Sequence, residues 1–148
     1  MRLLLDTGIL AQLCHPADSQ SQPLSRWVDE VLGSGAEVIV PEICDYELRR
    51  KLIHLIRKSQ SSQKSIDRLD ELGKLLDYLP LDTETMIHAA ELWADARSRG
   101  LPTASGDSLD GDVILAAQAL NVNGIVVTNN EKHLSQFVTA KSWEEITL

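Results

Sequence analysis

The sequence contains little cysteine and no long hydrophobic run. Its two cysteines, Cys14 and Cys44, are too few for a disulfide scaffold and lack the spacing of a metal site. No apolar run approaches the roughly 20 residues that a membrane-spanning helix needs. The first residues also lack the order of basic region, apolar stretch and cleavage site that marks a signal peptide. We therefore expect a cytoplasmic protein that does not bind a membrane.

Positive charge is scarce as well. The chain has 14 Lys and Arg residues against 22 Asp and Glu residues, so its net charge is −8. This balance argues against a general nucleic-acid binder that works by raw electrostatic attraction. It does not exclude an enzyme that meets phosphate groups through a bound metal ion and a local basic patch.

The pattern of apolar residues alternates between strand-like and helix-like segments. At 148 residues with 43% hydrophobic content and no internal repeat, the chain fits a single domain over residues 1–148. The alternation predicts an α/β fold, a three-layer α/β/α sandwich with a central, mostly parallel sheet. The predicted strands cover residues 2–5, 37–40, 78–81 (an edge strand) and 124–128, with a last short element near 137–143; the predicted helices cover residues 7–13, 23–32, 41–58, 63–78, 83–99 and 110–120.

Two details of these helices are also predicted. Pro41 is expected at the first position of its helix, because its fixed φ and missing N–H suit that place. In the helix over 83–99, an apolar stripe is expected to face inward; it contains Met86, Ala89, Ala90, Trp93 and Ala96.

Three carboxylates precede the most apolar helix. Asp107 is interpreted as a loop acid, Asp110 as the N-cap and Asp112 as a residue of the first turn. Carboxylates held close together repel one another, and Mg²⁺ or Mn²⁺ between them removes that repulsion. The spacing does not fit a calcium-binding loop. A metal site here must therefore recruit carboxylates from elsewhere in the chain.

Other polar residues follow the predicted strands. Asp6, Thr128 and Asn130 come after two of them, and Glu47 lies just over one helical turn beyond the end of a third. Sites in parallel sheets lie at the carboxyl ends of the strands, so these residues are expected at one edge. Three of them also have a plain structural alternative: Asp6 as a helix cap, Glu47 as a solvated acid, and Asn130 as a turn residue.

Four segments resemble the PIN domain family, and within it the VapC-type ribonuclease toxins. They are Leu3-Leu-Leu-Asp-Thr-Gly-Ile-Leu10, Val40-Pro-Glu-Ile-Cys-Asp-Tyr-Glu-Leu-Arg-Arg50, Asp112-Val-Ile-Leu-Ala-Ala117 and Val127-Thr-Asn-Asn-Glu-Lys-His-Leu134. Their order and spacing match the family over nearly the whole chain. The sequence departs from the family at Gly8, where Asn is frequent, and at Asn130, where many members carry a fourth carboxylate.

The resemblance implies an endoribonuclease that depends on Mg²⁺ or Mn²⁺ and cleaves single-stranded RNA. Asp6, Glu47 and Asp112 would surround the metal, and Asn130 would assist catalysis. Asp110 is a further candidate metal ligand, and Thr7 and Thr128 are candidate substrate-binding residues. An antitoxin protein is an expected partner, and a homodimer is a further expectation.

A run of basic residues follows Glu47 on the same predicted helix. Arg50, His54 and Arg57 share one helical face with Lys58. The plain interpretation is the solvated side of a helix. The alternative is a track for RNA phosphates that leads to Glu47.

Two other functions are compatible with parts of the sequence. A PIN-like domain with weak catalysis would bind RNA or an antitoxin without cleaving. Alternatively, the segment Leu3-Leu-Leu-Asp-Thr-Gly8 matches the signature of aspartic proteases, in which two Asp residues share a proton. Those proteases are rich in β-structure, whereas this chain is mostly helix-patterned.

Overall fold

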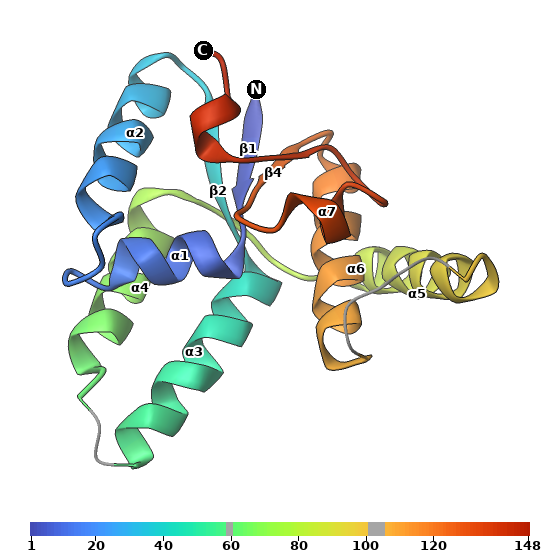
Figure 1. Cartoon of the computed structure of the whole chain (residues 1–148), viewed down its shortest axis with the longest axis horizontal. Coiled ribbons are helices and arrows are strands. Elements are labelled where there is room, and N and C mark those ends of the chain that lie inside the picture. Colours follow the sequence, from blue (N-terminus) through green and yellow to red (C-terminus); the bar gives the residue numbers. More distant parts are fainter. Residues whose placement is uncertain (59–60, 101–105) are drawn as a thin grey trace.

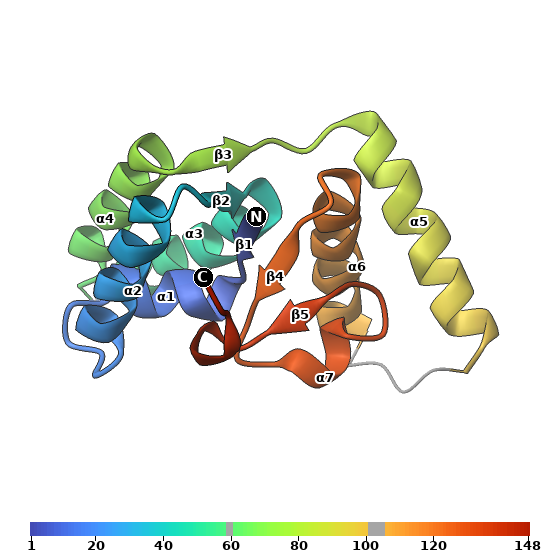
Figure 2. The same cartoon turned by 90° about the horizontal axis from the view of Figure 1, so that it is seen from above.

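The computed structural model describes residues 1–58, 61–100 and 106–148, and its centre is one parallel sheet. The strand order is β3-β2-β1-β4-β5 (Figure 2). The strands are β1 (Arg2–Leu5), β2 (Glu37–Pro41), β3 (Asp77–Leu79), β4 (Ile125–Val127) and β5 (Ala140–Lys141). All neighbouring strands pair in parallel, and β3 lies at an edge, as the sequence predicted.

Helices cover both faces of this sheet. Successive side chains of a strand point to opposite faces, yet Leu3, Leu4 and Leu5 are all fully buried, so neither face of β1 meets solvent. The helices are α1 (Thr7–Cys14), α2 (Ser21–Gly33), α3 (Glu42–Arg57), α4 (Gln63–Leu75), α5 (Thr83–Ser98), α6 (Gly106–Asn121) and α7 (Glu131–Leu134), with a 3₁₀ turn over Trp143–Glu145. The predicted α/β class is confirmed. Among the described residues, no helix combines the length and the apolar character needed to cross a bilayer.

The chain changes direction across the sheet at β1. It first proceeds from β1 to β2 and β3 on one side, and later returns to place β4 on the other side of β1. Strands β1 and β4 therefore flank a topological switch point, where parallel sheets open a crevice at the carboxyl ends of the strands. Figure 1 shows α1 and α3 leaving this edge, with α6 beside them.

The start of α6 differs from the prediction. The helix begins at Gly106, so Asp110 is not its N-cap and Asp112 lies in the second turn, not the first. Leu109 explains the extra turn, because it is 1% exposed and belongs to an apolar cluster with Ala89 of α5. Burial of Leu109 outweighs the local capping preference of Asp110. Asp107 is part of α6, but its side chain lies outside the described residues.

Two smaller predictions were also wrong. Pro41 ends β2 and is the N-cap of α3, which begins at Glu42; the extended conformation of Pro41 continues the pairing of β2 with β3. On α5, Met86 and Trp93 are 43% and 40% exposed, and Ala90 is exposed as well. Only the Ala89 and Ala96 positions of that stripe are buried, because small residues allow α6 to approach closely.

Candidate active site

The end of β1 places Asp6 at the switch point. Its backbone N–H continues the sheet by donating to the carbonyl of Val127 at 3.0 Å. The carboxylate then accepts two hydrogen bonds, from the backbone N–H of Thr7 at 2.7 Å and from the Thr128 hydroxyl at 2.6 Å. Burial nevertheless raises the pKa of Asp6, although both hydrogen bonds favour its charged form. Asp6 is therefore held in one orientation by groups from both sides of the crevice.

Glu47 reaches the same edge from the second turn of α3. Its Oε1 atom accepts a hydrogen bond from the Thr7 hydroxyl at 3.0 Å, and its Oε2 atom lies 3.9 Å from Nη2 of Arg50. Burial is the main cause that raises the pKa of Glu47, and the charge of Asp6 raises it further. The Asp6 carboxylate is thus close enough to Glu47 to disfavour its ionisation.

Asp112 of α6 completes a cluster of three acids. Burial, followed by the charges of Asp6 and then Glu47, raises its pKa from 3.8 to about 6, while His133 acts in the opposite direction. The end of β1, helix α3 and helix α6 are far apart in sequence, but the fold brings their three carboxyl groups close enough to interact electrostatically. We call Asp6, Glu47 and Asp112 the carboxylate cluster.

Gly111 allows α6 to approach Glu47. A Cβ atom at this position would stand 2.6 Å from Oε2 of Glu47 and 3.0 Å from its Cδ, which is closer than real contacts allow. The Glu47 carboxylate therefore lies directly against the backbone of α6, one residue before Asp112. This approach was not predicted from the sequence, although a glycine within a buried apolar helix was a visible signal.

The remaining candidate residues lie around the cluster. The Thr128 hydroxyl that donates to Asp6 also accepts from the backbone N–H of Asn130 at 2.9 Å, and Asn130 itself is exposed. The hydroxyls of Thr7 and Thr128 thus donate hydrogen bonds to carboxylates, and the binding of substrate by these two residues stays a prediction. His54 and Arg57 are exposed farther along α3.

A hollow of about 510 Å³ opens beside the cluster, between α3 and α6. Its lining residues are Ile43, Tyr46, Glu47, Arg50, Asp110, Gly111 and Ile114. Asp110 is exposed and stands two residues before Asp112, so the two side chains leave α6 in different directions. Asp110 as a metal ligand therefore stays a prediction that needs its own test.

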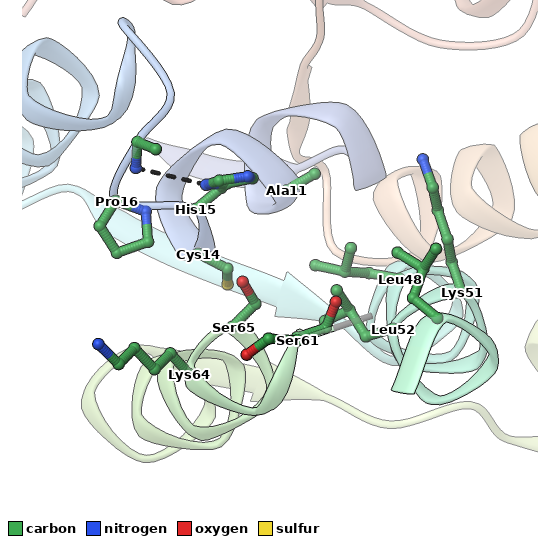
Figure 3. A pocket seen from close by; sticks show the side chains of 13 residues that line it. Ala11, Cys14, His15, Pro16, Leu48, Lys51, Leu52, Ser61, Lys64 and Ser65 are labelled. Atoms are coloured by element: carbon green, nitrogen blue, oxygen red, sulfur yellow. Dashed lines mark hydrogen bonds between the residues drawn. The ribbon is translucent and has the colours of Figure 1, made fainter. Parts of the chain in front are cut away.

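A second hollow, of about 440 Å³, lies on a different face of α3, against α1 and the start of α4 (Figure 3). Its floor includes Cys14 and Leu48, its rim includes Lys51 and Lys64, and none of its described lining residues is acidic. Burial raises the pKa of Cys14 to about 12, and burial raises that of Cys44 well above its usual value. Both thiols therefore stay protonated and do not provide a nucleophile.

The carboxylate cluster has the donor chemistry of a site for a hard divalent cation. Mg²⁺ and Mn²⁺ prefer carboxylate oxygens, and a cation would offset the burial of all three acids and the repulsion that adds to the raised pKa values of Glu47 and Asp112. Among the described residues, no three His, Cys, Asp or Glu side chains are arranged to hold an ion as they stand. The fit therefore rests on the type and charge of the donors.

Comparison with solved structures supports the fold. A chain of VapBC2 from Rickettsia felis, bound to a promoter DNA fragment, has a TM-score of 0.72 at 20% identity, covering 97% of this chain and 99% of that one. A chain of VapBC-1 from nontypeable Haemophilus influenzae has a TM-score of 0.70 at 20% identity, and the alignment covers 98% of this chain and 100% of that one. A chain of FitAcB from Neisseria gonorrhoeae also has a TM-score of 0.70 at 20% identity, and the alignment covers 97% of this chain and 99% of that one.

Sequence comparison identifies the family. No curated protein sequence matches the chain significantly. The family model of the PIN domain, however, matches residues 3–137, which is most of the chain. That span includes all three acids of the carboxylate cluster and the two threonines that bind them. The chain belongs to the PIN domain family.

Proposed function

We propose that this protein is an endoribonuclease that depends on Mg²⁺ or Mn²⁺ and hydrolyses single-stranded RNA. PIN domains are generally nucleases, so the reaction class follows from the family. The observation that supports metal dependence is the convergence of three carboxylates: besides burial, the charges of Asp6 and Glu47 both raise the pKa of Asp112. Arg50 and His133 offset only part of this negative charge, and a cluster of acids with perturbed pKa values is suited to bind a cation.

Asp6, Glu47 and Asp112 would hold the metal. When bound, it would lower the pKa of a water molecule and neutralise the phosphate charge. The chain's own residues prepare the site. The Thr128 hydroxyl fixes Oδ2 of Asp6, the Thr7 hydroxyl fixes Oε1 of Glu47, and Asn130 stands next to Thr128 for a contact with substrate. Arg50, next to Glu47, provides positive charge for a phosphate.

The aspartic-protease alternative does not fit this environment. Asp6 follows a parallel strand that helices cover on both faces, whereas those proteases are rich in β-structure. A non-catalytic RNA- or antitoxin-binding module stays the alternative. From the resemblance to VapC-type toxins, we also propose that an antitoxin protein binds the chain; a homodimer and a cytoplasmic location stay predictions.

Cleavage of RNA in the presence of metal tests the proposed function. The purified protein should cleave a single-stranded oligoribonucleotide with Mg²⁺ or Mn²⁺ and stop on addition of EDTA. Asp6→Asn should lose cleavage, because it removes charge from the carboxylate that two elements of the fold hold in place. Asp29→Asn, which removes an exposed acid of α2, is the matched control and should cleave normally. Cleavage that survives both EDTA and Asp6→Asn would overturn the proposal.

The basic residues of α3 lie on the same stripe as Glu47. Arg50, His54 and Arg57 follow it at helical spacing and are exposed, which suits a track for phosphates. Replacing Arg50 and Arg57 by Gln should weaken RNA binding. The slope of log K against log salt should flatten by about 0.7 to 1 unit for each phosphate that the variant no longer binds.

A matched pair of variants separates this track from overall charge. Arg26→Gln with Arg99→Gln removes the same two charges from exposed positions on α2 and just beyond α5. This control should keep the salt dependence of the parent protein. If the salt slope changes equally in both double variants, the basic residues of α3 are only the solvated side of a helix and not a phosphate track.

A further inference from the structure

The hollow beside the carboxylate cluster has one wall with an aromatic ring. Ile43, Tyr46, Glu47 and Arg50 form that wall, and their spacing places them on one face of α3. Tyr46 is 55% exposed, although burial of a tyrosine ring is favourable. No structural role in the core explains a ring at this place, immediately before Glu47.

Arg50 adds a cation to the same wall. Its guanidinium group lies over the Tyr46 ring, 5.1 Å from the ring centre, and also 3.9 Å from the Glu47 carboxylate. A flat aromatic surface, a flat cation and a candidate catalytic acid are thus adjacent. Bases of single-stranded RNA stack on aromatic rings and on guanidinium planes, while arginine also binds phosphate.

The opposite wall fixes the orientation of a nucleotide. It is formed by α6, and its charged residue is the exposed Asp110. Both Asp110 and Glu47 would repel a phosphate, and Arg50 is the cation among the lining residues, so the phosphate belongs beside Arg50 on the α3 side. The hollow, at about 510 Å³, is within the range of roughly 300–1,000 Å³ usual for small-molecule sites.

We propose that Tyr46 and Arg50 form a subsite for one nucleobase of single-stranded RNA, next to the carboxylate cluster. The subsite rests on the proposed nuclease function and extends it, because it gives a physical reason for single-stranded substrate. In a duplex, the bases are already stacked and do not reach a ring on the surface of a helix. An unpaired base stacks on the Tyr46–Arg50 pair, and its phosphate lies against the guanidinium group of Arg50, next to the carboxylate cluster.

The test measures binding in EDTA, using an oligoribonucleotide that carries 2-aminopurine, whose fluorescence falls on stacking. Tyr46→Leu should weaken binding about 5- to 100-fold, the range expected from losing one base–aromatic stack, and should abolish the fluorescence change. Tyr46→Phe keeps the ring and should behave like the parent protein. An abasic oligonucleotide of the same length should bind the parent and Tyr46→Leu equally.

A second aromatic–arginine pair provides the matched control. Arg97 lies over the exposed ring of Trp93 at 5.2 Å on α5, outside this hollow. Trp93→Leu should therefore keep the affinity and the fluorescence change. If Trp93→Leu loses as much as Tyr46→Leu, the subsite is overturned.

The outcomes separate the subsite from the nuclease function. If the parent protein cleaves RNA with metal while Tyr46→Leu binds both oligonucleotides as the parent does, the subsite is wrong and the nuclease stands. If the fluorescence change depends on Tyr46 but no RNA is ever cleaved, the nuclease is wrong and the subsite stands.

Discussion

Asp112→Asn is expected to lose metal-dependent cleavage by about 100-fold or more and, in EDTA, to melt at a higher temperature than the parent protein. The loss of activity follows from the proposed role of Asp112 as one of three ligands. A metal contributes several kcal/mol to catalysis, and each 1.4 kcal/mol is a factor of ten in rate. The gain in stability follows from the electrostatics of the metal-free cluster.

The pH dependence gives the sign of the stability effect. Burial first, and then Asp6 and Glu47, raise the pKa of Asp112 from 3.8 to about 6 in the folded protein. The folded state therefore favours protonated Asp112. That contribution is complete below about pH 4 and is lost as the pH rises to about 6. Because solvent screens the partly exposed Asp112, this loss of stability is about 1–2 kcal/mol, or roughly 2–8 °C in melting temperature. Asn carries no charge at this position, so Asp112→Asn does not lose this stability as the pH rises.

Thermal melts of both proteins between pH 4 and 7, with EDTA or Mn²⁺, measure this effect. In EDTA, the parent should lose stability as the pH rises. Mn²⁺ should restore that stability, because it binds the folded state and not the unfolded one. Asp112→Asn should show a smaller loss with pH and a smaller gain with Mn²⁺. Asp110→Asn removes an equal charge from an exposed position of the same helix turn and is the control for stability. Its metal response also decides whether Asp110 is a ligand. A lower melting temperature for Asp112→Asn in EDTA, with a parent indifferent to Mn²⁺, would contradict the cluster.

Gly111→Ala is expected to reduce metal affinity about 10- to 100-fold, with a matching loss of cleavage at low metal concentration, while leaving the fold intact. The added Cβ would stand 2.6 Å from Oε2 of Glu47, so this carboxylate has to shift away from α6, and we expect the shift to break its hydrogen bond with the Thr7 hydroxyl. Loss of a hydrogen bond that orients a metal ligand costs about this much in affinity. Titration calorimetry with Mn²⁺ measures the affinity directly, without any assay of cleavage.

The stability of Gly111→Ala should change little, although its metal affinity falls. Alanine favours a helix over glycine by about 0.5–1 kcal/mol, and the lost hydrogen bond between Thr7 and Glu47 costs a similar amount. The matched control is Gly73→Ala in α4, where a Cβ would meet Tyr78 at an ordinary 3.7 Å. That variant should gain stability and keep the parent's metal affinity. If Gly111→Ala also binds Mn²⁺ as the parent does, Glu47 is not a ligand.

The sequence predicted the fold and the edge of the sheet where the acids meet. Buried strands such as residues 3–5 are continuous apolar runs, and in a parallel sheet their carboxyl ends define the site, so the apolar pattern alone was enough to locate Asp6. Glu47 followed from the same argument, because α3 starts where β2 ends.

Contacts between distant elements could not be predicted. The helix start at Asp110 was inferred from a local capping preference, but packing of Leu109 against α5 extends the helix. Nothing local to Gly111 shows that it faces Glu47, because the rotation of α6 about its axis is set by its packing on its neighbours. The hydrogen bonds of the Thr7 and Thr128 hydroxyls to Glu47 and Asp6 could not be predicted either, because these partners come from other parts of the fold.

The hydrogen bond between Thr128 and Asp6 also has a consequence for the synthesis of the protein. Asp6 leaves the ribosome among the first residues, but the strand and hydroxyl that hold its carboxylate are made only after most of the chain. A nascent chain that stops before β4 lacks one whole side of the crevice, including Thr128. Under the proposed function, the active site would be completed only late in translation, so the RNA of the ribosome that makes the protein would not meet it while the chain is still short.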